Sequence, residues 1–320
     1  MKNKNGVMSV KAIIEKISQQ IQEGIYPGAS LALYRNGQWS EHYLGLADPE
    51  NGEPVGADLV YDLASVSKVV GVATICAFLY AKEELPLDRP FKELYPRFAH
   101  SRTTIRELLT HTSGLDPFIP NRDQLDARQL KKEIENLQLK EDKSFHYTDV
   151  NFLLLGFWLE EAFGQSLDDL FEELIFEPWK MTETRFGPVK KAVPTVRGVA
   201  SGCVHDPKAR VLGCHAGSAG LFSTVSDLES FLEHYLRDDF ARDLAQNFAC
   251  VEGKTRSLGW NLEGDWLDHT GYTGTFLMYN RKRQKAVIFL SNRTYEKDER
   301  AQWILDRNGL MDFIKQEFEK

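Results

Sequence analysis

The chain has 320 residues, 42% of them hydrophobic, and carries a net charge of −8 at neutral pH. This length allows one large domain or two closely packed ones. The pI near 5.6 argues against a nucleic-acid or anionic-membrane partner, because either would require a basic face. No stretch approaches the roughly 18 apolar residues of a membrane span, so none is expected.

The N-terminus has an early positive charge but no uninterrupted apolar run and no small-residue cleavage site. We therefore expect a cytoplasmic location, or an extracytoplasmic one if a leader has been removed.

Residues 9–47 carry the first predicted elements. Apolar residues at helical spacing predict an amphipathic helix from Ser9 to Gly24. Residues 29–47 then alternate as two strands around Asn36 and Gly37, a pair typical of a two-residue hairpin turn.

From about residue 62 to residue 236 the pattern changes to helices and loops. Residues 69–81 are apolar nearly all round, which predicts one buried helix. Residues 103–114 open with a capping box, Thr104 to Glu107, and close at Gly114. Further helices are expected at 151–164 and 223–236.

The last third returns to strands, expected around 257–262, 266–271, 275–280 and 285–292, before a final helix within 298–318. Strands at both ends of the chain most economically join one antiparallel sheet. The predicted fold class is therefore α/β (α+β), with terminal helices flanking that sheet and a mostly helical domain inserted. We place the sheet domain at 1–61 and 250–320 and the inserted domain at 62–249, with the active site in the cleft between them.

The cysteines and histidines do not predict a metal site. Four cysteines in so long a chain do not form a disulfide framework. Cys203, His205, Cys214 and His215 give the spacing C-x-H…C-H, which fits none of the usual zinc patterns. We expect neither a metal nor a cofactor.

Ser65 and Lys68 form the first candidate reactive pair. Positions three apart on a helix share a face, so the lysine can reach the hydroxyl. A serine needs a base to become a nucleophile, and apolar surroundings can lower a lysine pKa toward neutrality. An S-x-x-K pattern is nevertheless expected about once by chance in a chain this long. The competing interpretation is a helix-start serine with a lysine that reaches solvent.

Two later stretches add to this pair. Tyr147 and Asp149, with Asn151 just beyond, lie on a loop that leads into an apolar helix. A tyrosine at a cleft mouth can act as general acid or base when a cation lies nearby. His269, Thr270 and Gly271 lie on a late strand, where a glycine at a sheet edge lets a substrate approach the backbone.

The set S-x-x-K, Y-x-N and K-T-G or H-x-G resembles the serine β-lactamase and penicillin-binding protein superfamily. The chain is most similar to its class C β-lactamase branch, which includes D-alanyl-D-alanine carboxypeptidases and related esterases. Supporting phrases stand in the family's order over about residues 13–292: "DLASVSK", "LLTHTSGL", "AGLFSTVSDLESF", "SLGW" and "HTGYTGT". The resemblance implies a β-lactamase/transpeptidase-like fold.

The resemblance also implies roles for individual residues. Ser65 would be the acylated nucleophile, Lys68 its proton partner and Tyr147 the second acid/base group. The backbone N–H groups of Ser65 and Tyr272 would form the oxyanion hole. Which of Lys68 and Tyr147 is the base in each step stays open. The resemblance implies no cofactor, and the partner would be a small-molecule or short peptide substrate; the oligomeric state stays open.

Two positions depart from the family pattern. Asp149 replaces the usual asparagine, and near Lys68 it could hold the lysine protonated and leave Tyr147 as the base. Asn151 is a candidate source of the missing amide. His269 stands where β-lactamases carry a lysine that helps bind the substrate carboxylate. The candidate substrate-binding residues are Asp149, Asn151, His269, Thr270 and Gly271. We expect weak or no β-lactamase activity, and activity on anionic substrates that falls above pH ~6.5.

The leading hypothesis is a serine hydrolase that acts on an ester, an amide or a D-amino-acid peptide through an acyl-enzyme at Ser65. A carboxylesterase that needs no substrate carboxylate is the alternative within the class. The alternative from another class is a catalytically degenerate binding or sensor module of the same fold. A metal-dependent hydrolase is disfavoured because the histidines and acids lack ligand spacing.

Overall fold

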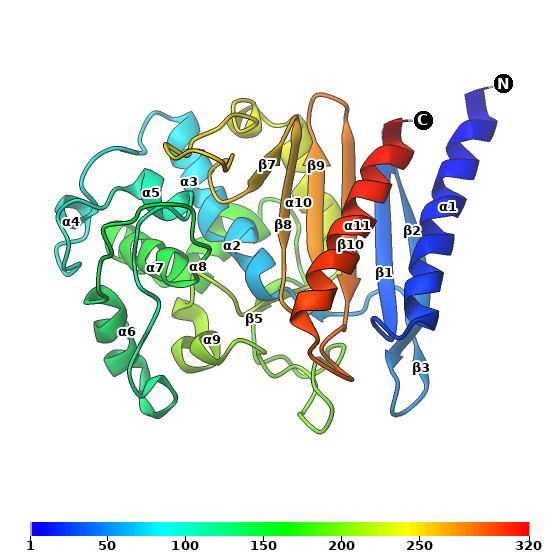
Figure 1. Cartoon of the computed structure of the whole chain (residues 1–320), viewed down its shortest axis with the longest axis horizontal. Helices are drawn as coiled ribbons and strands as arrows, with labels where there is room; N and C mark the ends of the chain where they lie inside the picture. Colours follow the sequence, from blue (N-terminus) through cyan, green and yellow to red (C-terminus); the bar gives the residue numbers. More distant parts are fainter. Residues whose placement is uncertain (1, 320) are drawn as a thin grey trace.

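The computed structural model describes residues 2–319, with side chains from residue 10 onward. Its centre is a seven-stranded antiparallel sheet of order β3-β2-β1-β10-β9-β8-β7 (Figure 1). These strands are β1 (Gly28–Arg35), β2 (Gln38–Asp48), β3 (Glu53–Pro54), β7 (Asn261–Glu263), β8 (Trp266–Thr270), β9 (Phe276–Asn280) and β10 (Lys285–Ser291). A small sheet of order β4-β6-β5 contains β4 (Tyr61–Asp62), β5 (Arg185–Phe186) and β6 (Leu221–Ser223).

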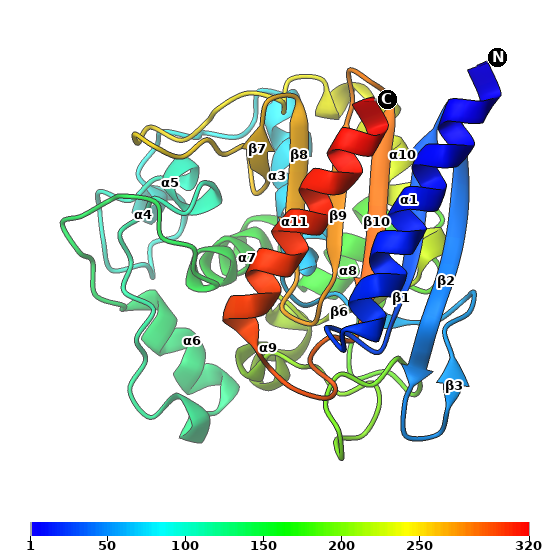
Figure 2. The same cartoon turned by 45° about the vertical axis from the view of Figure 1, so that its right-hand side comes forward.

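Helices lie on both faces of the large sheet, and others form a helical region beside it (Figure 1). The helices are α1 (Lys2–Gln22), α2 (Ser67–Val70), α3 (Val72–Ala81), α4 (Phe91–Leu94), α5 (Ile105–Leu109), α6 (Ala127–Glu135), α7 (Val150–Phe163), α8 (Leu167–Phe171), α9 (Pro207–Leu212), α10 (Val225–Arg237) and α11 (Arg300–Glu319). The terminal helices α1 and α11 lie side by side on one face, as Figure 2 shows. α10 packs against β1, β9 and β10, and the apolar residues of that face belong to the same core as the helical region.

The pairing of β1 with β10 joins the two ends of the chain. Ala29 pairs with Ser291 and Tyr34 with Ala286, in antiparallel register. Both faces of β1 are buried, because Leu31 and Leu33 belong to the α1–α11 core and Ala32 and Tyr34 to the other one. The predicted sheet of N- and C-terminal strands with terminal helices is therefore confirmed.

Several predicted element boundaries were wrong. α1 begins at Lys2, β7 covers only Asn261–Glu263, and α5 ends at Leu109 because the chain leaves the helix before His111, which has φ 57°. The single helix predicted over 69–81 is broken at Gly71, where φ is −104° and ψ is −94°, so α2 and α3 are separate. A continuous apolar run in the sequence does not indicate such a break, because the break depends on which side chain packs against the glycine.

The expectation that no stretch is apolar enough for a membrane span was also wrong. Ala64–Ala81 reaches a mean hydropathy of 1.6 over 18 residues, and 72% of this window is buried inside the fold. The segment is thus long and apolar enough by composition, and the protein itself covers most of it.

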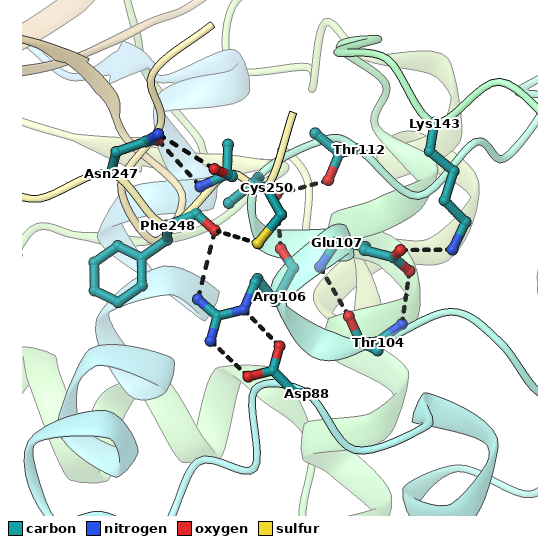
Figure 3. Close-up of polar contacts among 11 residues, drawn as sticks. Asp88, Thr104, Arg106, Glu107, Thr112, Lys143, Asn247, Phe248 and Cys250 are labelled. Atoms are coloured by element: carbon teal, nitrogen blue, oxygen red, sulfur yellow. Dashed lines mark hydrogen bonds and ion pairs between the residues drawn. The ribbon is translucent and has the colours of Figure 1, made fainter. Parts of the chain in front are cut away.

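The predicted capping box of α5 is present (Figure 3). Thr104 accepts a hydrogen bond from the Glu107 N–H, and the Glu107 carboxylate accepts one from the Thr104 N–H and contacts Lys143. Arg106 on the same helix pairs with Asp88 and donates to the carbonyl of Phe248. The capping box thus fixes the start of α5, and the helix positions the turn that follows it at residues 110–114.

The β8–β9 loop is tied to the segment just before Ser65. Thr273 Oγ1 donates to the Asp62 carbonyl at 2.8 Å, and Thr275 Oγ1 donates to the Leu63 carbonyl at 3.0 Å. Ala64 has φ 46°, an unfavourable value for a residue with a Cβ. The Asp62 carboxylate accepts the Ala64 N–H at 2.8 Å and the His205 N–H at 2.7 Å, and so holds this strained turn.

Gly71→Ala should destabilise the protein by about 1–3 kcal/mol, because a Cβ at this position would lie 2.3 Å from the fully buried Phe171 ring. The matched control is Gly56→Ala, where a Cβ would meet no atom within 4 Å. Denaturant unfolding measures both variants, and equal stabilities would contradict the prediction.

Asp62→Asn should change how stability depends on pH. Burial raises the pKa of Asp62 to about 6 from its ordinary 3.8, so the folded protein binds this proton more tightly than the unfolded chain. The contribution of Asp62 to stability therefore falls as pH rises from about 4 to about 6. The Tm of Asp62→Asn relative to wild type should rise over that interval, and Asp243→Asn, at an exposed position, is the control. A Tm difference for Asp62→Asn that stays constant over the interval would refute this assignment.

Candidate active site

Ser65 and Lys68 face each other at the start of α2. Ser65 lies in a short 3₁₀ turn, Ala64–Val66, and Lys68 lies in the first turn of the helix. The Lys68 Nζ donates to Ser65 Oγ at 2.8 Å. The predicted reach across three positions is therefore present, and the alternative of a lysine that extends to solvent is wrong, because Lys68 is fully buried.

All three protons of the Lys68 ammonium have acceptors. Besides Ser65 Oγ, Nζ donates to Asp149 Oδ1 at 2.7 Å and to the Ser218 carbonyl at 2.9 Å. Burial by itself lowers the Lys68 pKa, but the Asp149 carboxylate and Tyr147 outweigh it, and the pKa lies above its usual range. The idea that apolar surroundings lower this pKa toward neutrality was therefore wrong.

Asp149 stays ionised opposite Lys68. Burial raises the pKa of its carboxyl, but Lys68 and Lys208 lower the pKa well below its usual range. The Lys208 Nζ lies 3.1 Å from Asp149 Oδ2. The carboxylate thus contacts one ammonium with each oxygen, and it holds Lys68 in its protonated form.

Tyr147 lies at the mouth of the site, 37% exposed, on the loop before α7. Lys68 Nζ is 5.2 Å from the centre of its ring. The His111 ring lies against it with a centroid distance of 4.5 Å, and the His269 ring is 6.2 Å away on the opposite strand. The tyrosine is therefore placed by two aromatic neighbours and faces the Lys68 cation.

β8 presents alternate residues to its two faces. Leu267 belongs to the core on the helical side, whereas Trp266 belongs to the α1–α11 core. His269 points to the same side of β8 as Leu267 and lies near Tyr147. Thr270 points to the other side, where its Oγ1 accepts a hydrogen bond from Arg307 of α11 at 3.0 Å. His269 and Thr270 of the H-T-G motif therefore face different sides of β8.

His269 is 2% exposed, and neither ring nitrogen has a hydrogen-bond partner among residues 2–319. Burial lowers its pKa well below the usual value, and the charges of Lys68 and Arg256 lower it further. The ring is therefore already neutral at pH 6.5. Titration of His269 therefore does not support the expected loss of activity above pH ~6.5.

Gly271 and Tyr272 complete the strand end. A Cβ at Gly271 would lie 2.6 Å from the Leu63 carbonyl oxygen, so only glycine allows this approach to the Ser65 segment. The Tyr272 carbonyl accepts from Arg293 Nε at 2.8 Å, and the ring lies under the guanidinium groups of Arg293 and Arg300. This packing holds Tyr272 beside Ser65 in the same cavity.

The predicted contact of Asn151 with substrate is not supported by its position. Asn151 is fully buried and is not among the residues that line the cavity. Its side-chain oxygen accepts from Ser113 Oγ at 2.7 Å, and its amide nitrogen lies 3.2 Å from His111 Nδ1. Two residues beyond Asp149, the helix turns this side chain into the core, where it supports the turn after α5.

The cavity in front of Ser65 has a volume of about 650 Å³ and extends between β7, β8 and α11. Ser65, Tyr147, His269, Thr270, Gly271 and Tyr272 line it. Its basic lining residues are Lys254, Arg293, Arg300, Arg307 and Lys315. Arg293 pairs with Asp298 and Lys315 with Glu263, whereas Arg300 and Arg307 form no ion pair with any described carboxylate. This side of the cavity therefore favours an anionic group.

Sequence reasoning missed Lys208, Arg300 and Arg307. Arg300 and Arg307 lie seven positions apart on α11, a spacing that places them on one helix face, and this signal could have found them. Lys208 lies in a short helix between loops, and nothing in its local sequence indicates a contact with Asp149, 59 positions earlier in the chain.

Cys203, His205, Cys214 and His215 do not gather into one site. The His205 ring lies 5.4 Å from the Tyr272 ring, whereas His215 pairs with Glu160 at 2.5 Å. Among residues 2–319, no group of three or more histidine, cysteine or acidic side chains is arranged to hold a metal ion.

Known proteins resemble this chain over nearly its whole length. A "Putative D-alanyl-D-alanine carboxypeptidase" of Escherichia coli K12 is 27% identical over an alignment of 352 residues, covering 87% of this chain and 81% of that protein. A β-lactamase/D-alanine carboxypeptidase structure from Pseudomonas syringae superposes with a TM-score of 0.75 at 18% identity, covering 97% of this chain and 99% of that one. A class C β-lactamase structure gives 0.76 at 19% identity, covering 99% of each chain.

These structural likenesses agree with the predicted β-lactamase/transpeptidase-like fold. The "Beta-lactamase" family model matches residues 13–310. The chain therefore belongs to the beta-lactamase family.

Proposed function

We propose that this protein is a serine hydrolase that forms an acyl-enzyme at Ser65. The observation that carries the proposal is the 2.8 Å hydrogen bond from Lys68 Nζ to Ser65 Oγ, at the wall of a cavity that Tyr147 also lines. A nucleophile, a buried cation and an acid/base group around one cavity are the parts that acyl transfer requires.

In the acylation step Ser65 Oγ attacks the substrate carbonyl, and Tyr147, acting as the general base, takes up the hydroxyl proton. Tyr147 is the better base because the Lys68 ammonium already uses its three protons in hydrogen bonds. Tyr147 faces this cation, with Lys68 Nζ 5.2 Å from the centre of its ring. Because Ser65 Oγ accepts from Lys68, the lysine also stabilises negative charge that develops on the nucleophile.

The tetrahedral intermediate places its oxyanion between the backbone N–H groups of Ser65 and Tyr272. It collapses as the leaving group departs with the proton from Tyr147, which leaves the acyl ester on Ser65. Tyr147 then accepts a proton from water, the hydroxide attacks the ester, and Ser65 regains its proton as the acid product leaves.

The substrate side of the proposal rests on the arginines of α11. Arg307 donates to Thr270 Oγ1 beside the reactive serine, and Arg300 lies over the Tyr272 ring. With His269 neutral, these guanidinium groups and the Lys254 ammonium are the basic lining groups that form no ion pair with a described carboxylate, and a substrate carboxylate can use them. We infer a substrate with a free carboxylate near the scissile bond, such as a D-alanyl-D-alanine peptide, and weak or no turnover of β-lactams. The names of the relatives agree with this class.

Ser65→Ala should abolish a covalent adduct that wild type forms with p-nitrophenyl butyrate and with a fluorophosphonate, as measured by intact-mass spectrometry. Lys68→Ala and Tyr147→Phe should each reduce kcat by roughly 10²-fold or more, as expected for an acid/base group. An adduct that persists in Ser65→Ala would place the nucleophile elsewhere. No adduct in wild type would favour a binding or sensor module of the same fold.

Arg307→Ala should weaken inhibition of ester hydrolysis by N-acetyl-D-alanyl-D-alanine about tenfold or more, because it removes a charged partner of the carboxylate. The C-terminal amide of the same dipeptide lacks that charge, so its inhibition should change little. Arg185→Ala, an exposed arginine of β5, is the matched control. Equal effects of Arg307→Ala on acid and amide would refute the carboxylate assignment and favour a carboxylesterase.

A further inference from the structure

Asp149 lies between the fully buried Lys68 and the partly buried Lys208. Its Oδ1 is 2.7 Å from Lys68 Nζ and its Oδ2 is 3.1 Å from Lys208 Nζ. The Lys68 side chain is 0% exposed, that of Lys208 is 13% and that of Asp149 is 25%. At such low exposure, charge–charge interactions are screened far less than on the surface.

The position of Lys208 is built into α9. Asp206 caps this helix by accepting the Ala209 N–H at 2.8 Å, and Pro207 occupies its first turn. The Asp206 carboxylate also lies 3.6 Å from Lys208 Nζ. The four side chains Lys68, Asp149, Lys208 and Asp206 thus alternate in charge, and together they are neutral when all are ionised.

Lys208 constrains the Asp149 carboxylate by its second oxygen. With both oxygens bound, rotation of the carboxylate is restricted, and Oδ1 stays directed at Lys68. Lys208 also neutralises part of the Asp149 charge, so the negative charge of the carboxylate is shared between the two ammonium groups. An amide at position 149, as the resemblance to the family leads one to expect, would leave two ammonium groups close together without a carboxylate between them.

We propose that Lys208 is a positioning residue for acylation of Ser65 and that Asp149 and Lys208 are required together. Lys208 acts through Asp149, which in turn orients the Lys68 ammonium against the nucleophile. This proposal rests on the proposed function, since it assigns a part in the same acylation step. It explains how the chain tolerates an aspartate where the family pattern has an asparagine.

The test is a double-mutant cycle with Asp149→Asn, Lys208→Met and the two combined, assayed for hydrolysis of p-nitrophenyl butyrate. Lys208→Met should lower kcat about tenfold with little change in KM, since Lys208 does not line the cavity. Asp149→Asn should lower kcat more, and the double variant should be more active than Asp149→Asn alone. Lys208→Arg keeps the charge and should retain most of the activity.

Lys190→Met, at an exposed lysine, is the matched control and should behave as wild type. Wild-type kcat in Lys208→Met, or a double variant no more active than Asp149→Asn, would overturn the proposal. Either result would reject only the role of Lys208, because the wild-type protein would still form the Ser65 adduct that the proposed function requires.

Thermal unfolding of the same variants tests the pairing without reference to activity. Lys208→Met should lower Tm by several degrees when residue 149 is aspartate and raise Tm when it is asparagine, because the sign of the interaction reverses. A change of the same sign in both backgrounds would overturn the proposal. If wild type forms no Ser65 adduct but the Tm changes reverse in sign, the pairing stands and the proposed function fails.

Discussion

The buried Lys68 ammonium is the constraint on which the rest of the site depends. A charge without exposure to solvent needs acceptors for every proton, and Ser65, Asp149 and Ser218 supply them from three separate segments of the chain. The α2 turn, the loop before α7 and the loop before β6 must therefore converge on one atom. Loss of the Ser65 or Ser218 contact leaves a buried ammonium proton without an acceptor, and loss of Asp149 leaves Lys68 without the carboxylate that pairs with it.

A second set of ties connects this group to the sheet. Thr273 and Thr275 donate to carbonyls at residues 62 and 63, and the absence of a side chain at Gly271 lets β8 approach the same segment. The end of β8 and Ser65 are thus held as one unit, although Thr270 lies 205 positions after Ser65 in the chain. The β1–β10 pairing places the whole sheet in register for this contact. Catalytic geometry on a rigid sheet edge is a common way to keep reacting groups pre-organised.

Local patterns predicted a large part of the fold and the centre of the site. The Asn36–Gly37 hairpin, the α5 capping box and the amphipathic first helix each follow from a few adjacent residues, and all are present. Ser65, Lys68 and Tyr147 could be singled out because ordered motifs accompany them. The break at Gly71 and the direction of Asn151 could not, since the first depends on the Phe171 ring and the second on the helix phase after Asp149.

The sequence by itself determined which chemical groups are present: a serine and a lysine three apart, a tyrosine before an apolar helix, and Asp149 and His269, where the family resemblance leads one to expect an asparagine and a lysine. Only the tertiary structure decided their charge states. Lys68 is protonated because Asp149 lies 2.7 Å away, and His269 is neutral because it is buried beside Lys68 and Arg256. A pKa depends on burial and on charges that come from distant parts of the chain, and neither is encoded in the spacing of a motif.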